Sequence, residues 1–595
     1  MDDNQNSYYQ NKKSINQNYW KLSTKTELET HFELFFSQRF NFPSALVPIL
    51  IENKVSKDNF ELFLDPKIKN FLPDPSIFID MDKTVKRIAN EIETKNPIGI
   101  FGDYDVDGAT SAALLKLFLQ YFGIEVHIHI PDRFLEGYGP NISALNSLVS
   151  KGSNLIITVD CGINSHEPLK ELNKTDIDCI IIDHHTPDDD LPPAFSIVNP
   201  KRKENGIEYH YLSAVGVTFI MIVGLTRELR QRGVFEKIKE PNLFRFLDLV
   251  ALGTVCDVVP LKGLNRCFVK AGLNIISQRK NLGINALCDI SDLNKIPDEE
   301  TLGYKIGPKI NAAGRIGSSD IGVSLLISKD ISKANELASK LYQLNEKRKK
   351  LTNNSILEAI GMVESEKNMI GKLPDFLFLV GENWNEGIIG ILAGKIKEKY
   401  NRPCCVISLG QNHSKGSARS IANIPIGEYF LEALDKKLLV KGGGHDLAAG
   451  LTIENNKIQM FKDFLISKVE HAFQENELVS EISVTSELSI SALNSDLMDW
   501  IKKLGPWGQG NPIPKFLIKD VIIKKLVFFG KEKQHLLVKV SDNSGEIDCK
   551  IFNINETAFS SVLEKNKSLH LLGNLVSNEW NNKNKVEFNL IDIMT

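Results

Sequence analysis

Three aspartates at alternate positions, Asp103, Asp105 and Asp107, stand in a short acidic turn of this sequence. Three carboxylates so close together repel one another and lose hydration, so a bound cation would stabilise them. The apolar run 98–101 before the turn predicts a strand, and the pattern over 109–122 predicts a helix. Because open α/β sheets bind ligands at the carboxyl ends of strands, we expect a cation site here. Taken alone, the motif is equally compatible with a solvated acidic turn.

Three further segments end in groups that bind metals. Two are predicted strands, whose carboxyl ends would meet the acidic turn at one edge of a parallel sheet. The third is a predicted apolar helix over 243–252, which would run into a loop. The side chains concerned are Asp160 after strand 155–159, His184 and His185 after strand 179–182, and Asp257 after the helix.

Aspartates and histidines together form a ligand set that suits Mn²⁺ or Mg²⁺. There are more carboxylates than a single ion needs. Two ions that share a bridging aspartate would use them all, and that arrangement serves phosphoryl displacement. The sequence therefore predicts a two-metal centre.

The elements that must position these groups alternate between strand and helix. The fold class is α/β, with two α/β lobes joined by a long helix and a C-terminal OB-type β-barrel of five short strands with one helix between them, near 555–564. Residues 1 to about 25 are polar and rich in Asn and Gln, and we expect them to be disordered. Glycine-rich turns are expected at 442–444 and 450. The predicted domains are 1–75 (polar tail and helical lead-in), 76–330 (first α/β domain), 331–370 (long helix), 371–478 (second α/β domain) and 479–595 (barrel).

One face of the long helix carries a basic run, 346–350, in the sequence Glu-Lys-Arg-Lys-Lys. The run is compatible with a solvated helix face or with the wall of a channel for a polyanion, and a solvated face is slightly favoured. The chain as a whole carries a net charge of −4, so any polyanion site must be a local patch.

Bulk composition limits the class of protein. The chain has 595 residues, 42% of them hydrophobic, and eight cysteines without a CxxC pair. These values are typical of a globular protein of several domains in a reducing compartment. No signal peptide or membrane-spanning segment is predicted. We therefore expect a cytoplasmic protein that is a monomer and does not contact membranes.

Seven motifs, in order and spacing, resemble the DHH phosphoesterase superfamily. Within it the chain is similar to the RecJ branch, the single-strand-specific 5′→3′ DNA exonucleases, over roughly residues 75 to 595. The motifs are DYDVDG from Asp103, DCG from Asp160, DHH from Asp183, GTVCDVVPL from Gly253, GPKINAAGR from Gly307, SARS from Ser417, and KGGGH from Lys441 with AAG from Ala448.

The resemblance implies a role for each matching residue. The metal ligands would be Asp105, Asp107, Asp160, His184 and Asp257, with Asp160 as the bridge. Whether Asp103 contacts a metal directly stays open. His185 would contact a phosphate, and Arg315, Ser417, Arg419 and His445 would grip the phosphates of the substrate, including a terminal 5′-phosphate.

Two further positions, Gly443 and Asn385, lie in or near these motifs. The glycine run around Gly443 would let backbone N–H groups approach a phosphate, although an ordinary turn is the simpler interpretation. One position departs from the family, because Asn385 follows Trp384 where His is usual, and we assign it no role.

The family implies a single-stranded-DNA-specific 5′→3′ exonuclease (DHH and DHHA1 lobes plus an OB domain) that releases 5′-mononucleotides with two Mn²⁺ or Mg²⁺ ions. Recombination and repair would be its setting, with a helicase and a single-strand-binding protein as partners. The alternatives are a relative that hydrolyses pyrophosphate, short oligonucleotides or cyclic dinucleotides, and a non-catalytic DNA-binding scaffold. The barrel and long helix favour the exonuclease, because a small substrate needs neither.

Overall fold

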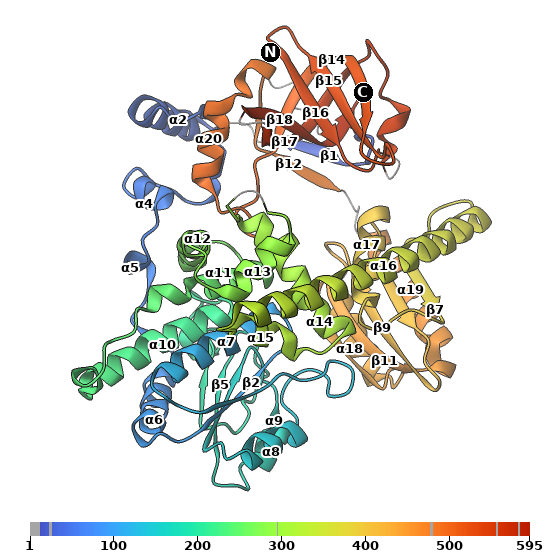
Figure 1. Ribbon diagram of the computed structural model, residues 1–595. Helices are drawn as coiled ribbons and strands as arrows, with labels where there is room; N and C mark the ends of the chain where they lie inside the picture. The colour runs from blue at the N-terminus through green and yellow to red at the C-terminus, as the bar shows by residue number, and fades with distance from the viewer. Residues whose placement is uncertain (1–11, 23–25, 294–295, 476–479, 555–556, 581–582) are drawn as a thin grey trace.

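The computed structural model describes residues 12–22, 26–293, 296–475, 480–554, 557–580 and 583–595. Figure 1 shows an α/β domain, a second α/β lobe beside it and a β-barrel above both. The helix α16, Ile331–Ile370, runs from the first domain to the second lobe. The predicted architecture of two lobes, a long connecting helix and a C-terminal barrel is confirmed.

The first domain is built on five parallel strands in the order β3-β2-β4-β5-β6. The chain passes from β2 to β3 on one side and then crosses to β4 on the other. The strand order therefore reverses at β2 and β4, which is where ligands bind in such sheets. The strands are β2 Ile98–Gly102, β3 Val126–His129, β4 Leu155–Val159, β5 Asp178–Ile182 and β6 Ser196–Val198.

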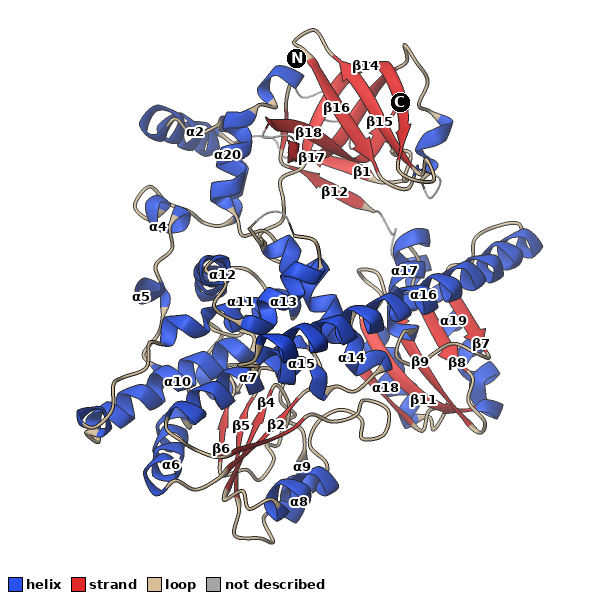
Figure 2. Cartoon of the chain, viewed as in Figure 1, coloured by secondary structure: helices blue, strands red, loops and turns tan. Residues whose placement is uncertain are grey.

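Helices cover both faces of this sheet (Figure 2). One face packs on α6, α7 and α10, while the other packs on α8 and α9. Ile100 of β2 belongs to the first core and its neighbour Phe101 to the second, as the alternation of side chains along a strand requires. The helices are α6 Met81–Thr94, α7 Val106–Tyr121, α8 Ile142–Ser150, α9 His166–Leu172 and α10 Ala214–Gln231.

A group of helices completes the first domain and joins it to α16. Ala334 and Leu341, near the start of α16, pack into the core of the first domain, whereas Ala359 and Val363 pack into the second lobe. One continuous helix therefore fixes the two lobes to each other. The helices before it are α11 Leu247–Cys256, α12 Gly263–Ser277, α13 Leu282–Ile290, α14 Gly307–Ile316 and α15 Asp320–Leu326.

The second lobe has a mixed sheet in the order β10-β11-β9-β8-β7. Its helices α18 and α19 cover one face, and α17 with the end of α16 covers the other. The strands are β7 Leu377–Gly381, β8 Cys404–Ser408, β9 His413–Arg419, β10 Lys441–His445 and β11 Ala448–Glu454, and the helices are α17 Ile389–Tyr400, α18 Ile426–Asp435 and α19 Ile458–Glu475.

The expectation of glycine-rich turns in this lobe is wrong. Residues 442–444 lie within β10 and Gly450 lies within β11, where Gly443 and Gly450 are paired across the ladder. A side chain at Gly444 would overlap the backbone of Ala448. Glycine is depleted in strands except where backbones approach closely, which is the case here.

The C-terminal domain is a β-barrel that a pairing between β14 and β17 closes. The five predicted strands are present, but the helix expected near 555–564 is a single short turn at Ala558–Ser561, and residues 555–556 lie outside the described residues. The elements are β13 Ser486–Glu487, α20 Ser495–Leu504, β14 Phe516–Phe529, β15 His535–Ser541, β16 Glu546–Ile551, β17 Ser568–Trp580 and β18 Lys583–Met594.

The helical lead-in packs on the barrel and extends its core. Phe36, Phe42 and Phe60 share one buried cluster with Phe516 and Phe588 of the barrel. Sequence patterns indicate that these helices bury a face, but not against which domain. The lead-in helices are α2 Glu27–Phe40, α3 Val47–Glu52, α4 Phe60–Leu64 and α5 Ile68–Phe71.

The expected disorder of the N-terminal tail is wrong for residues 19–22. β1, Tyr19–Leu22, pairs in parallel with β12, Glu481–Val484. Trp20 is fully buried, and its indole N–H donates to the carboxylate of Asp592 at 3.1 Å. Residues 1–11 and 23–25 of the expected disordered segment lie outside the described residues.

Two further predictions concern the cysteines and membrane-spanning segments. All eight cysteines are free thiols, and seven of them are buried. In the described part of the chain, we find no helix with the length and apolar character that a bilayer crossing requires.

Candidate metal centre and phosphate site

The acidic turn connects the end of β2 to the start of α7, at the point where the strand order reverses. Asp105 caps α7, and one of its carboxylate oxygens accepts hydrogen bonds from the N–H groups of Asp107 at 2.8 Å and Gly108 at 3.0 Å. A Cβ at Gly108 would overlap the backbone of Asp103. Glycine at this position therefore lets the turn fold tightly enough to gather its carboxylates.

Asp107 faces the N-terminus of α10. Its two carboxylate oxygens accept hydrogen bonds from the N–H groups of Ala214 at 2.6 Å and Val215 at 3.0 Å. The positive end of the helix dipole favours a carboxylate there. Burial and the charge of Asp105 nevertheless raise the pKa of Asp107 to about 7. The protein thus fixes this carboxylate in place but leaves it poorly compensated.

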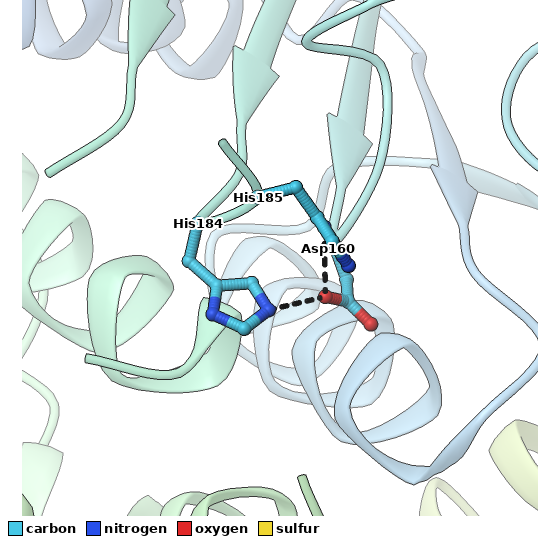
Figure 3. Close-up of side chains that lie close together, drawn as sticks. All are labelled: Asp160, His184 and His185. Carbon is cyan, nitrogen blue, oxygen red and sulfur yellow. Dashed lines mark ion pairs between the residues drawn. The ribbon is translucent and has the colours of Figure 1, made fainter. Parts of the chain in front are cut away.

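Asp160 and His184 face each other at the ends of β4 and β5 (Figure 3), with Asp160 Oδ1 3.3 Å from His184 Nε2. His184 Nδ1 lies 3.0 Å from the carbonyl oxygen of Leu212, which can only accept a hydrogen bond, so Nδ1 carries the hydrogen. Burial lowers the pKa of His184 to about 3, so the ring is neutral. Its Nε2 lone pair therefore points at carboxylates, as in a metal ligand.

Asp257 completes this side of the cluster, with Oδ2 3.6 Å from His184 Nε2. The expectation that it arrives from a loop is wrong, because α11 continues to Cys256 and Asp257 is its C-cap. Gly253 lets the last turns of α11 pack directly on α7, because a Cβ at this position would lie 2.8 Å from Asp107 Oδ1.

Four buried atoms in this centre have no hydrogen-bond partner among the described residues: Asp103 Oδ1, Asp160 Oδ1, His184 Nε2 and Asp257 Oδ2. Burial, together with the neighbouring acids, raises the pKa of Asp103, Asp160 and Asp257 well above the usual range. Unpaired buried oxygens and an imidazole lone pair are costly unless a cation binds them. The residues therefore fit a divalent metal centre.

The ligand atoms fall into trios whose members all lie within 4.8 Å of one another. Two trios share no residue, and each could hold one ion, while a third links them. The trios are Asp103, Asp105 and Asp160; Asp107, His184 and Asp257; and Asp160, His184 and His185. Asp160 belongs to the first and third trios, which is compatible with two divalent ions that share Asp160.

Two residues of the centre were not singled out from the sequence. Asp183 is fully buried and accepts hydrogen bonds from the N–H groups of His184 and His185 and from the ring of His185 at 2.8 Å. Burial favours the neutral form of His185, yet the carboxylate of Asp183 raises its pKa overall. The hydroxyl of Tyr138 lies 3.1 Å from the same ring. Asp183 could have been found from the sequence, because it is the first residue of the DHH motif. Tyr138 could not, because it lies in a loop whose sequence shows no motif.

A cluster of arginines lies between the two lobes. Arg419 donates to the hydroxyl of Ser417 at 3.0 Å, and Arg315 donates across the lobes to the carbonyl of Gly387 at 3.1 Å. Burial lowers the pKa of Arg315 to about 10, and the charges of Arg133 and Arg348 add to the effect. No ion pair involves Arg315 or Arg419 in the described part of the chain, so these buried guanidinium groups form a candidate site for an anion.

Arg133 and Arg348 were not predicted individually. Arg133 lies over the ring of Tyr104, 5.0 Å from its centroid, and so connects the acidic turn to the arginine cluster. Of the basic run on α16, Arg348 is close enough to lower the pKa of Arg315, whereas Lys349 is exposed and paired with Glu346. Of this run, Arg348 therefore lies close to the arginine cluster, whereas Lys349 belongs to a solvated face of the helix.

Strand register places Gly443 and His445 relative to this cluster. Gly443, Gly450 and Ser417 lie in one row across β10, β11 and β9, and His445 and Arg419 lie in the next row but one. Side chains in one row of an antiparallel sheet share a face, so His445 lies on the face of Arg419, two strands away.

The departure at Asn385 has a local explanation. Its side-chain oxygen accepts the N–H of Gly387 at 2.9 Å, which shapes the turn that Arg315 contacts. Trp384 beside it is buried, with its N–H donated to Glu358 of α16 at 2.8 Å, so it is a core residue.

Comparisons with known proteins agree across the chain. Residues 97–254 match the DHH family N-terminal domain, 374–471 the DHHA1 domain and 484–592 the RecJ OB domain. The single-stranded-DNA-specific exonuclease RecJ of Haemophilus influenzae is 35% identical over 85% of this chain and 89% of its own length. Its counterpart in Escherichia coli is 35% identical over 80% and 84% respectively. The crystal structure of Thermus thermophilus RecJ with Mn²⁺ superposes with a TM-score of 0.80 at 25% identity, covering 97% of this chain and 79% of that one.

Proposed function

This chain belongs to the RecJ family of single-stranded-DNA-specific exonucleases, and from that premise we propose that it degrades single-stranded DNA from the 5′ end by metal-assisted hydrolysis. The products would be 5′-mononucleotides. The observation that supports this most directly is the juxtaposition of an unpaired carboxylate–imidazole centre with an unneutralised arginine cluster.

The acidic centre would hold two divalent cations, Mn²⁺ or Mg²⁺. Asp105, Asp107, His184 and Asp257 would be ligands, Asp160 the shared one, and Asp103 a further ligand on the Asp105 side. Such ions lower the pKa of a bound water and neutralise charge that develops on a phosphate under attack. The chain's own contribution is to hold the ligands before the metal binds, through the backbone hydrogen bonds to Asp105 and Asp107.

Histidine and arginine side chains would position the DNA. The carboxylate of Asp183 favours the protonated form of His185, so His185 would donate to an oxygen of the scissile phosphate. Arg419 and Arg315 would grip the terminal 5′-phosphate with paired N–H groups, helped by Ser417. A grip on the 5′-phosphate beside the metal centre would place the first internucleotide bond at the metals, which gives the direction of degradation.

Arg133 would join the two halves of this site. It lies against Tyr104 of the acidic turn, and its charge lowers the pKa of both Arg315 and Arg419. A phosphate placed among these arginines would therefore lie beside the metal centre. His445 and the backbone of Gly443, on the same sheet as Arg419, would extend the contact along the strand.

The barrel would hold the incoming strand. The rings of Phe529, at the end of β14, His535, at the start of β15, and Phe552, just after β16, form a contact cluster, with Phe552 half exposed. OB domains bind oligonucleotides on this face and the adjoining loop, where bases stack on aromatic rings. We also propose, on the family resemblance alone, cytoplasmic action in recombination and repair with a helicase and a single-strand-binding protein.

The test is degradation of strands labelled at the 5′ or the 3′ end. We expect a DNA single strand with Mn²⁺ to release label as a mononucleotide at once from the 5′ end and only late from the 3′ end. Duplex DNA, RNA and a cyclic dinucleotide should react much more slowly. Early release from the 3′ end would refute the direction, and faster cleavage of the cyclic dinucleotide would favour the small-substrate phosphodiesterase.

A further inference from the structure

A cavity of about 340 Å³ lies apart from the metal centre, between the lead-in and the first turn of α12. This volume is in the range of small-molecule sites. The lead-in supplies mainly apolar residues, and α12 supplies basic ones. The lining residues that matter here are Val55, Phe63, Phe71, Lys54, Lys262 and Arg266, and none of them belongs to the metal centre or the arginine cluster.

Arg266 is the most unusual group in this lining. It is 3% exposed, and its Nη2 donates to the carbonyl oxygens of Phe63 at 3.3 Å and Leu504 at 2.8 Å. Its Nε and Nη1 have no hydrogen-bond partner within the described ranges. No ion pair involves Arg266 in the described part of the chain, although the charge of Glu299 acts on it from beyond ion-pair distance. A buried guanidinium with unpaired N–H groups is costly, and a bound anion would reduce that cost.

The N-terminus of α12 adds a second positive feature. α12 has 15 residues, and its N-cap residue, Lys262, makes no side-chain capping bond. The N–H of Leu264 in the first turn donates to the hydroxyl of Tyr211 at 3.1 Å, and the helix dipole favours an anion at this end. Lys54 and Lys262 are exposed at the cavity, and Glu52 is the one acid among the described residues that line it.

The rest of the lining that matters here is aromatic and aliphatic. Phe63 lies under the Arg266 guanidinium, 4.2 Å from its ring centroid to Cζ, and Phe71 and Val55 line the same cavity. A ligand that fills the site therefore needs a negative charge at one end and a flat apolar group at the other.

We propose that this cavity binds a small phosphorylated ligand with a flat ring, represented by a nucleoside monophosphate. The phosphate would face the first turn of α12 with Lys262 and Arg266, and the base would lie against Phe63 and Phe71. Because Arg266 also holds the carbonyl of Leu504, at the end of α20, the ligand would bind where the first domain meets the barrel. The proposal does not depend on nuclease activity.

The first test measures binding by calorimetry in EDTA, in full-length Arg419→Ala protein, so that metals do not contribute and the arginine cluster is weakened. The probes are deoxyadenosine 5′-monophosphate, inorganic phosphate and deoxyadenosine. We expect the monophosphate to bind about tenfold more tightly than either fragment, because only it satisfies both ends of the cavity. Equal affinity for the monophosphate and phosphate would overturn the proposal, as would no binding at millimolar concentrations.

Variants then identify the site. Lys262→Ala should weaken monophosphate binding about tenfold, whereas the matched control Lys69→Ala, at an exposed position of α5 outside the lining, should not change it. An equal effect of both substitutions would overturn the assignment.

Crystals of the full-length chain soaked with 5-bromo-deoxyuridine monophosphate give an independent answer. An anomalous bromine peak between Phe63 and Phe71 supports the site, and bromine found solely at the arginine cluster contradicts it.

Discussion

Asp160→Asn removes one charge from the metal centre while it keeps the shape of the side chain. Asp160 has a φ of +62°, a left-handed conformation that Asn tolerates almost as well as glycine, so the backbone should not change. Its Oδ1 is buried, lacks a hydrogen-bond partner in the described part of the chain, and lies 3.3 Å from His184 Nε2. The substitution therefore tests charge separately from fold.

The structure predicts opposite effects with and without metal. In metal-free protein at pH 8, loss of an unpaired buried carboxylate should raise the free energy of unfolding by about 1–3 kcal/mol. Mn²⁺ at a hundred times its dissociation constant should stabilise the wild type by ~2.7 kcal/mol. It should stabilise Asp160→Asn far less, because the shared ligand is gone. Turnover should fall at least about a thousandfold, which corresponds to ~4 kcal/mol of transition-state free energy.

Thermal unfolding with EDTA or Mn²⁺, and hydrolysis of 5′-labelled single strands, measure these quantities. Asp189→Asn is the matched control, because that side chain is 96% exposed. The reasoning is refuted if Mn²⁺ stabilises Asp160→Asn as much as the wild type, or if its turnover stays within tenfold.

Four other outcomes are expected. Arg419→Ala should reduce the ratio of kcat/KM for 5′-phosphorylated over 5′-hydroxyl strands about tenfold or more, and an unchanged ratio would count against the phosphate grip. Gly108→Ala should destabilise the protein by several kcal/mol, since its Cβ meets backbone, and a melting temperature equal to that of the wild type would show otherwise. Because burial and Asp105 raise the pKa of Asp107 to about 7, above an unfolded value of about 3.9, metal-free stability should fall as the pH rises through that window, while Mn²⁺ affinity rises. An affinity that is flat from pH 5 to 8 in a Mn²⁺ titration would contradict this. Trp20→Ala should cost about 3–5 kcal/mol in thermal unfolding yet leave Mn²⁺ affinity unchanged, and a loss of affinity would contradict the separation of tail and metal centre.

The strands and most of the metal centre could be predicted from the sequence. A parallel strand buried on both faces appears as a short apolar run, and an acid directly after such a run marks the ligand-binding edge of the sheet. Asp160 follows this rule, and Asp105 and His184 lie two or three residues beyond the ends of their strands. The two lobes and the barrel could also be predicted, since the lobes alternate apolar strand runs with helical patterns, while the barrel strands alternate apolar and polar residues.

Other features depend on tertiary packing that one sequence does not record. An apolar segment such as α11 gives no signal for its own end, so Asp257 was expected on a loop. Glycines in β10 suggest turns until the close approach of β11 is known. Amphipathic lead-in helices indicate a buried face but not the barrel as its partner. Tyr138 and Arg133 lie in a loop, where their role follows only from the neighbours that the fold supplies.

Anomalous diffraction at the manganese edge, from crystals grown with Mn²⁺, tests the two-metal centre directly. We expect two manganese peaks at the carboxyl ends of β2 and β4, one beside Asp103 and Asp105, the other beside His184 and Asp257, with Asp160 contacting both. A single peak with Asp160 turned away, or manganese found solely outside this centre, would contradict it.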